Sequence, residues 1–149
     1  MIDPYDDVYF MKRALQEAQF AFDQGEIPVG AIIAIDNKII ARAHNLTERL
    51  TDVTAHAEMQ AITSASNFLG GKYLQQCTLY VTLEPCQMCA GALYWSQIGK
   101  IVYGANDRQR GYSIMGTTLH PKTKVQSGIL VQECERIMKR FFVDKRKLN

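Results

Sequence analysis

The spacing of apolar residues along the 149-residue chain switches repeatedly between a helical and an extended period. Between residues 4 and 24, apolar side chains recur three and four positions apart, which predicts a helix that Gly25 ends. The apolar positions of this first helix are Val8, Met11, Leu15, Ala18 and Phe22.

A continuous apolar run then begins after Pro28 and covers residues 29–35. The chain turns at Asp36-Asn37 and becomes apolar again at residues 39–41. This pattern predicts a hairpin whose first strand is mostly buried.

Helical and extended segments continue to alternate in the middle of the chain. Thr54 is a candidate N-cap for a helix from near His56 to about residue 68, and residues 78–82 read as a strand. A second helix is predicted from the Pro85-Cys86 step to about residue 95, followed by a strand at 101–103.

After a loop-rich stretch, the chain is predicted to end in a helix from residue 129 to about 146. Helices alternating with strands predict an α/β fold, a three-layer α/β/α sandwich around a mixed sheet. No repeat, linker or low-complexity tract interrupts the pattern, so we expect one domain, 1–149. The side chains expected to face inward from the last helix are Leu130, Cys134, Ile137, Met138 and Phe141.

Composition limits the setting of this domain. The four cysteines have no even spacing, which favours a reducing compartment. The first residues are acidic and lack the apolar region of a signal peptide, and no run of 18 apolar residues occurs. These features lead us to expect a cytoplasmic protein that does not enter a membrane.

The net charge of +2 is unevenly distributed. Residues 1–99 carry 6 basic and 11 acidic side chains, whereas residues 100–149 carry 11 basic and 4 acidic ones. A basic C-terminal third is typical of a surface that contacts a phosphate backbone, but it is also typical of a solvated helix with a basic tail.

The strongest chemical signal is His56-Ala57-Glu58 followed by Pro85-Cys86-Gln87-Met88-Cys89. One imidazole and two thiolates suit a four-coordinate Zn²⁺ whose last position is open for water. Glu58 lies close in sequence to this ligand set without being needed in it, so it is a candidate proton carrier. His-x-Glu with Pro-Cys-x-x-Cys is the signature of zinc nucleobase deaminases.

A Cys-x-x-Cys pair alone has two other interpretations, a redox pair or half of a structural zinc knot. A redox pair explains neither Glu84-Pro85 nor the upstream His-Ala-Glu. A structural knot needs a fourth ligand, and no spare candidate lies at the paired spacing of a second knuckle. Those candidates are Cys77, Cys134, His44 and His120.

Both groups of ligands are expected at helix N-termini, where free N–H groups and the helix dipole stabilise negative charge. The thiolates of Cys86 and Cys89 gain from this position, and a bound metal lowers their pKa further. Pro85 is expected in the first turn of its helix, where the absent N–H costs nothing.

Taken together, these motifs make the chain resemble bacterial tRNA adenosine deaminases of the cytidine-deaminase-like zinc superfamily over nearly its whole length. The resemblance implies a five-stranded sheet with flanking helices, a homodimer, and conversion of the wobble adenosine of a tRNA anticodon stem-loop into inosine. The matching stretches are residues 25–31, 43–45, 54–58, 78–86, 88–92, 104–107 and 141–142.

The resemblance implies that His56, Cys86 and Cys89 bind one zinc ion per chain. It assigns to Glu58 the transfer of protons between water, the ring nitrogen and the departing ammonia. Whether the metal is zinc or iron is not decided by these residues.

The resemblance also implies two residues that bind substrate. Asn45 matches an asparagine that hydrogen-bonds the target base, although it is also a common turn residue. Asp107 matches an aspartate that contacts a ribose hydroxyl, although it is also a common N-cap. Lys145 and Arg146 match a basic end that meets the tRNA backbone, or form a solvated tail.

Two stretches depart from the tRNA deaminase pattern. Residues 108–115 replace a longer glycine-rich segment that ends in Gly-Ser, although their arginines and tyrosine can serve phosphates and stacking. Residues 92–95 resemble bacterial guanine deaminases, or reflect core packing of Tyr94 and Trp95. Residues 27–31 and the Phe141-Phe142 pair favour the tRNA enzymes.

The sequence therefore predicts a zinc hydrolase that deaminates adenosine in tRNA. A deaminase of a free base or nucleoside, guanine or cytosine, is the alternative, and a non-catalytic zinc-stabilised RNA-binding module is a second one. The identity of the tRNA and the position of the dimer interface stay open.

Overall fold

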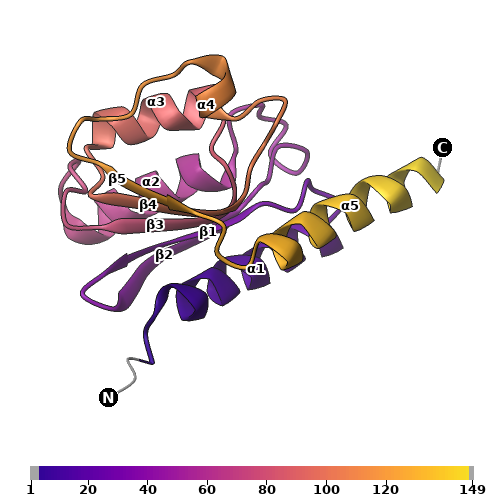
Figure 1. Cartoon of the computed structure of the whole chain (residues 1–149), viewed down its shortest axis with the longest axis horizontal. Coiled ribbons are helices and arrows are strands. Elements are labelled where there is room, and N and C mark those ends of the chain that lie inside the picture. Colours follow the sequence, from indigo (N-terminus) through magenta and orange to yellow (C-terminus); the bar gives the residue numbers. More distant parts are fainter. Residues whose placement is uncertain (1–3, 148–149) are drawn as a thin grey trace.

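A computed structural model describes residues 4–147 of the expected 1–149 domain; residues 1–3 and 148–149 lie outside the described part. Helices cover both faces of a central five-stranded sheet (Figure 1). The elements are α1 Asp7–Asp23, β1 Gly30–Ile35, β2 Lys38–His44, α2 Ala57–Leu69, β3 Thr78–Leu83, α3 Gln87–Ser96, β4 Lys100–Ala105, α4 Tyr112–Met115, β5 Lys124–Ser127 and α5 Val131–Lys147.

The strand order is β2-β1-β3-β4-β5. Strand β1 is antiparallel to both β2 and β3, whereas β3, β4 and β5 run parallel to one another. Because parallel neighbours need crossover connections, α3 joins β3 to β4. The mixed five-stranded sheet expected from the sequence is confirmed.

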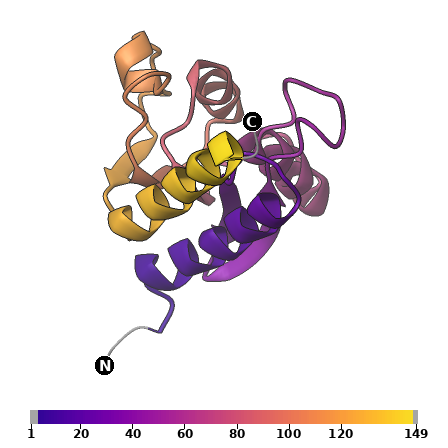
Figure 2. The same cartoon turned by 90° about the vertical axis from the view of Figure 1, so that its right-hand side faces the viewer.

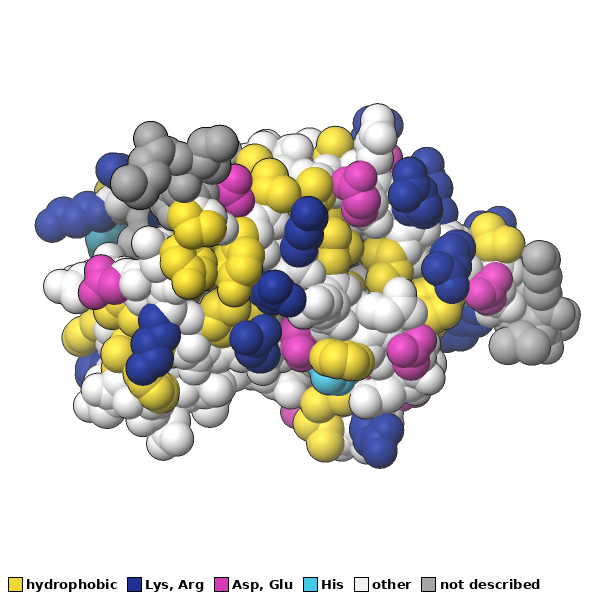
Figure 3. Space-filling view, turned by 90° about the horizontal axis from the view of Figure 1, so that it is seen from below, with side chains coloured by type: hydrophobic (Ala, Val, Ile, Leu, Met, Phe, Trp, Pro, Cys, Tyr) yellow, Lys and Arg dark blue, Asp and Glu magenta, His cyan; other side chains and the backbone are white. Residues whose placement is uncertain are grey.

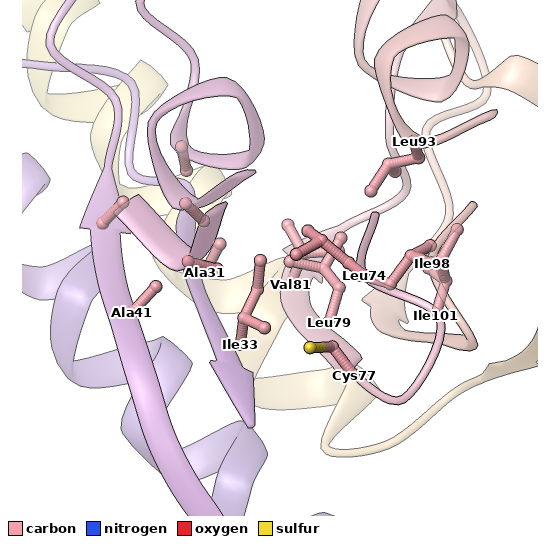
Figure 4. Packing of buried hydrophobic residues seen from close by; sticks show 14 of the residues in the cluster. Ala31, Ile33, Ala41, Leu74, Cys77, Leu79, Val81, Leu93, Ile98 and Ile101 are labelled. Atoms are coloured by element: carbon pink, nitrogen blue, oxygen red, sulfur yellow. The ribbon is translucent and has the colours of Figure 1, made fainter. Parts of the chain in front are cut away.

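Alternating side chains along the strands supply two separate cores. Ile33 pairs with Leu79, which pairs with Ile101, and all three belong to the core beneath α2 and α3 (Figure 4). Their neighbours Ile32 and Tyr80 face the opposite core, against α1 and α5. Figures 1 and 2 show these two helix pairs on opposite faces of the sheet, which confirms the three-layer α/β/α sandwich.

Close approach between layers requires glycine at two positions. A Cβ on Gly30 of β1 would lie 2.0 Å from the carbonyl oxygen of Ala14 in α1. A Cβ on Gly104 of β4 would lie 2.3 Å from Sγ of Cys134 in α5. These two contacts let α1 and α5 lie directly on the sheet. Within residues 4–147, no helix is long and apolar enough to cross a membrane.

The first helix begins later than the sequence pattern indicated, at Asp7, because the Asp6 carboxylate accepts a 2.8 Å bond from the Tyr9 N–H and so caps it. Val8, one of the expected apolar positions, is 38% exposed. Phe10 is buried in its place and stacks on Tyr80.

The two central helices begin near the predicted positions, but two residues expected at their starts have other roles. Thr54 does not cap α2; its N–H and hydroxyl both bind the Asp52 carboxylate, and His56 is the N-cap. Pro85 lies outside α3, whose N-cap is Cys86. Because each helix begins only after its N-cap, His56 and Cys86 lie on extended backbone, whereas Cys89 lies within α3.

The C-terminal third differs from the sequence pattern at three elements. The last helix begins at Val131 because Leu130 has a φ of 54°, which a helix cannot contain. The apolar pattern predicts neither the short helix α4 nor the position of the fifth strand, β5. All four residues of β5 are exposed, so no apolar alternation marks it.

Candidate active site

The starts of α2 and α3 bring His56, Cys86 and Cys89 together over the sheet. The Nδ1 atom of His56 lies 3.6 Å from Sγ of Cys86 and 3.5 Å from Sγ of Cys89. All three possible ligand atoms lie within 4.8 Å of one another. In tetrahedral coordination with zinc bond lengths near 2.0 and 2.3 Å, a nitrogen and a sulfur ligand lie about 3.6 Å apart. The three side chains therefore fit a zinc ion.

The two thiols share one proton when no metal is bound. A hydrogen bond from Cys89 lowers the pKa of Cys86 to about 4, and His56 contributes in the same direction. The pKa of Cys89 is raised strongly, first by its bond to Cys86 and then by burial. The bond to Cys86 likewise raises the pKa of the His56 imidazole. A preformed thiolate at Cys86 makes the site ready for a cation.

Glu58 lies in the first turn of α2, two positions after His56, and its side chain is only 4% exposed. Burial raises the pKa of Glu58 to about 7, and the nearby Cys86 acts in the same direction. A carboxyl group that titrates near neutral pH can both accept and release a proton there. Its place beside the metal ligands is that expected of a proton carrier.

A cavity of about 1020 Å³ opens over these residues. His56, Glu58 and Cys86 line it together with three walls from elsewhere in the chain. Such a volume lies at the upper end of the range for small-molecule sites, so it admits more than a single free base. The walls are Asn45, Thr47, Glu48, Thr51, Asp52 and Val53 after β2, residues 105–110 after β4, and Glu135, Met138, Lys139 and Phe142 of α5; Ile27, Val29, Leu83 and Glu84 complete the lining.

Asn45 follows β2 directly and lines this cavity, although it is 7% exposed. Its Oδ1 accepts a 2.8 Å hydrogen bond from the backbone N–H of Ala57. This contact identifies the oxygen end of the amide, so Nδ2 is the donor left for a ligand. Asn45 is thus more than a turn residue, because it ties the end of β2 to the start of α2.

Asp107 lines the opposite wall. Its Oδ1 accepts 3.0 Å bonds from the N–H groups of Gln109 and Arg110, so it organises a tight turn. The following helix α4 has Gly111 as its N-cap, so Asp107 does not cap a helix. The second carboxylate oxygen of Asp107 is the one available to a ligand.

Two buried glutamates that the sequence reasoning left without a role hold the loops of the cavity. Glu26 is 1% exposed and accepts bonds of 2.9 and 2.8 Å from the N–H groups of Glu48 and Arg49. Glu84 is 3% exposed and serves the loop after β4 in the same manner. Neither partner set is near in sequence, so periodicity carries no signal for either residue.

The core-packing account of Tyr94 and Trp95 is wrong. Trp95 is 77% and Tyr94 36% exposed, because α3 turns Cys89 and Leu93 toward the core instead. The two rings contact each other edge to face, 5.8 Å apart.

Six of the eleven basic residues of the C-terminal third lie on α5. Lys145 and Arg146 are both exposed on this helix, and Lys139 reaches the cavity wall. Figure 3 views the face that carries α1 and α5 and shows Lys and Arg side chains toward the end of the molecule where α5 projects. A positive surface thus adjoins the mouth of the cavity.

Comparison with known proteins agrees with this geometry. The sequence profile of the cytidine and deoxycytidylate deaminase zinc-binding region matches residues 4–105. The chain is 44% identical over 147 residues to the tRNA-specific adenosine deaminase of Bacillus subtilis strain 168, covering 95% of this chain and 91% of that one.

Solved structures are similar as well. One from a study of A-to-I editing by tRNA:A34 deaminases at the wobble position of transfer RNA has a TM-score of 0.82 and 40% identity, covering 87% of this chain and 98% of its own. A guanine deaminase from Bacillus subtilis has a TM-score of 0.62 and 38% identity, covering 72% and 66%.

Proposed function

The chain belongs to the family of the cytidine and deoxycytidylate deaminase zinc-binding region, and from this membership we propose that it deaminates adenosine to inosine at the wobble position of tRNA. The reaction is hydrolytic, with water entering at the ring carbon and ammonia leaving. The observation that carries the proposal is near-full-length similarity, at 44% identity, to a tRNA-specific adenosine deaminase.

His56, Cys86 and Cys89 are the residues that would hold zinc, since their ligand atoms meet the spacing of a tetrahedral site. When bound, zinc supplies a Lewis acid that lowers the pKa of water and so provides a nucleophile at neutral pH. Three protein ligands leave one position for that water.

Glu58 is the proton carrier in this proposal. It takes a proton from the attacking water, delivers one to the ring nitrogen of the base, and helps ammonia to leave. The burial of Glu58 beside the proposed ligands supports this role, and in the metal-free site it raises the pKa of the carboxyl to about 7. A purely structural zinc site has no need of such a carboxyl, which argues against a non-catalytic RNA-binding module.

Substrate recognition falls to the cavity walls. The Nδ2 amide of Asn45 donates to the target base, and Asp107 accepts a hydrogen bond from a ribose hydroxyl. Lys145 and Arg146 contact the phosphate backbone of the stem-loop. The arrangement is supported by the position of both substrate residues on the cavity that contains the metal ligands.

The assembly and location belong to the same proposal. A homodimer is supported by exposed apolar side chains on one side of the molecule, where Trp95 of α3 is 77% exposed and Ile114 and Met115 of α4 are at least half exposed. A tRNA substrate supports the cytoplasmic location expected from the sequence. Mass measurement by light scattering would test the dimer.

A deaminase of free guanine is the second candidate, favoured by the 38% identity of the Bacillus subtilis guanine deaminase structure. The zinc-loaded protein should form inosine in an anticodon stem-loop with adenosine at the wobble position. Matched assays with guanine, cytosine and their nucleosides separate the candidates. Release of ammonia only from a free base or nucleoside would contradict tRNA deamination.

A further inference from the structure

The carboxylate of Glu84 is buried at the end of β3, two residues before the ligand Cys86. Its Oε1 accepts a 3.1 Å bond from the N–H of Asp107. Its Oε2 accepts bonds of 3.1 and 2.6 Å from the N–H and the hydroxyl of Ser113. One buried charge thus holds both ends of the segment 107–113.

This segment is also attached to the metal-binding turn. Gly111 forms an isolated β-bridge with Cys86, and the N–H of Tyr112 donates a 2.9 Å bond to the carbonyl of Pro85. Residues 107–110 of the same segment line the cavity. A displacement of Glu84 would therefore move one wall of the cavity relative to the metal ligands.

The fit between Glu84 and the segment leaves no free space. A Cβ on Gly111 would lie 2.4 Å from Cδ of Glu84 and 2.5 Å from the carbonyl oxygen of Asp107. The backbone of Gly111 has a φ of −60°, which any residue adopts. Glycine is required here for close packing against the carboxylate and not for backbone conformation.

We propose that Glu84 is a positioning residue that fixes segment 107–113 as a wall of the substrate cavity and thereby sets affinity for the RNA. Glu84 acts through Asp107, whose N–H it binds and whose turn it keeps in place. The substrate side of this inference rests on the proposed tRNA function. The reaction itself is left to the metal ligands and Glu58, which come from the starts of α2 and α3.

The test is steady-state kinetics of zinc-loaded Glu84→Gln on the anticodon stem-loop, with zinc content measured in parallel. A glutamine offers an N–H₂ group where one carboxylate oxygen accepted from the backbone, so segment 107–113 loosens. We expect KM to rise about tenfold or more, which corresponds to the loss of one such contact, while kcat stays within about threefold. Zinc should stay at one per chain.

Two further variants approach the same contact from the loop. In Gly111→Ala the added Cβ would clash with the Glu84 carboxylate, so KM should also rise. Ser113→Ala loses only the hydroxyl bond to Glu84 and should raise KM less. Gly71→Ala is the matched control, because a Cβ there meets nothing within 4 Å. Amide exchange at Asp107 and Ser113 should quicken in Glu84→Gln even without RNA.

Unchanged KM in both Glu84→Gln and Gly111→Ala, or a loss confined to kcat and zinc content, would overturn the positioning role. Failure of the unaltered protein to act on the stem-loop contradicts the proposed function instead. In that case, unchanged amide exchange in Glu84→Gln would still contradict the structural part of the inference.

Discussion

Oδ1 of Asn45 accepts a hydrogen bond of 2.8 Å from the N–H of Ala57, the residue between His56 and Glu58. The amide proposed to face the base is thereby fixed to the helix start that carries the proposed zinc ligand His56 and the proposed proton carrier Glu58. This hydrogen bond holds the side chains of Asn45, His56 and Glu58 at a fixed spacing, as a positioned reaction requires.

Asn45→Asp separates the two contacts of this side chain. Aspartate keeps an acceptor for Ala57 but loses the amide donor, so zinc content and stability should persist while kcat/KM falls by about 100-fold. Asn45→Ala should show the same kinetic loss and in addition lose about 1 kcal/mol of unfolding free energy. Kinetics and denaturant unfolding of both variants check this. Full activity of Asn45→Asp would remove the base contact from the proposal.

Glu58→Ala should retain one zinc per chain, because the carboxylate is not needed among the ligands. Turnover should fall by about 100- to 10,000-fold, the usual contribution of a positioned proton carrier. Metal analysis and single-turnover kinetics measure both quantities, and the same analysis decides between zinc and iron. Glu133→Gln, which alters an exposed carboxylate on α5, is the control. Unchanged turnover would contradict the mechanism.

Cys86 should react first with iodoacetamide in the metal-free protein. Its pKa of about 4 keeps it a thiolate from pH 6 to 8, so its rate should hardly change over that interval. An ordinary thiol gains roughly 80-fold in thiolate over the same interval. Cys89, whose pKa is raised, should react slowly, and zinc should protect both. Peptide mass spectrometry reads out each site; faster labelling of Cys89 would disprove the assignment.

Asp107→Asn keeps an oxygen for the N–H groups of Gln109 and Arg110 but removes the negative charge available to a ribose hydroxyl. We expect turnover of the stem-loop to fall about tenfold, with zinc content unchanged. A stem-loop with a deoxy residue at the relevant ribose should show little further loss in this variant. If the unaltered protein treats ribose and deoxyribose stem-loops equally, Asp107 has no ribose role.

Gly30→Ala should destabilise the fold by about 3 kcal/mol, since its Cβ would meet backbone atoms of α1 that cannot rotate away. Gly91→Ala in α3 is the comparison, because a Cβ there has no neighbour within 4 Å and alanine favours a helix by roughly 0.5–1 kcal/mol. In thermal unfolding of the zinc-loaded proteins, the melting temperature should be lower for Gly30→Ala and higher for Gly91→Ala than for the unaltered protein. Equal stability of Gly30→Ala would refute the close contact.

Most of the sheet and the metal ligands could be read from local patterns. The apolar run at 29–35 and the strand at 78–82 are buried on both faces, and such runs are visible in any sequence. The spacing within Pro85-Cys86-Gln87-Met88-Cys89 is likewise local. Strand β5 could not be predicted from the apolar pattern because all its side chains are exposed.

The roles of Glu26 and Glu84 could not be predicted, because their partners lie more than 20 residues away in sequence. The prediction that Trp95 packs in the core was wrong for a different reason. An aromatic residue in a helix is usually buried, but α3 is only ten residues long and its inward face is already filled by Cys89, Ala90 and Leu93.

The two buried glutamates have a consequence for how substrate specificity can evolve. Glu26 and Glu84 accept hydrogen bonds from main-chain N–H groups of the loops that form the cavity walls. Every amino acid except proline provides such a group. Side chains on the walls can therefore be replaced over generations while the walls keep their course. Proteins with this fold can therefore evolve specificity for a new substrate while the residues that carry out the deamination stay unchanged.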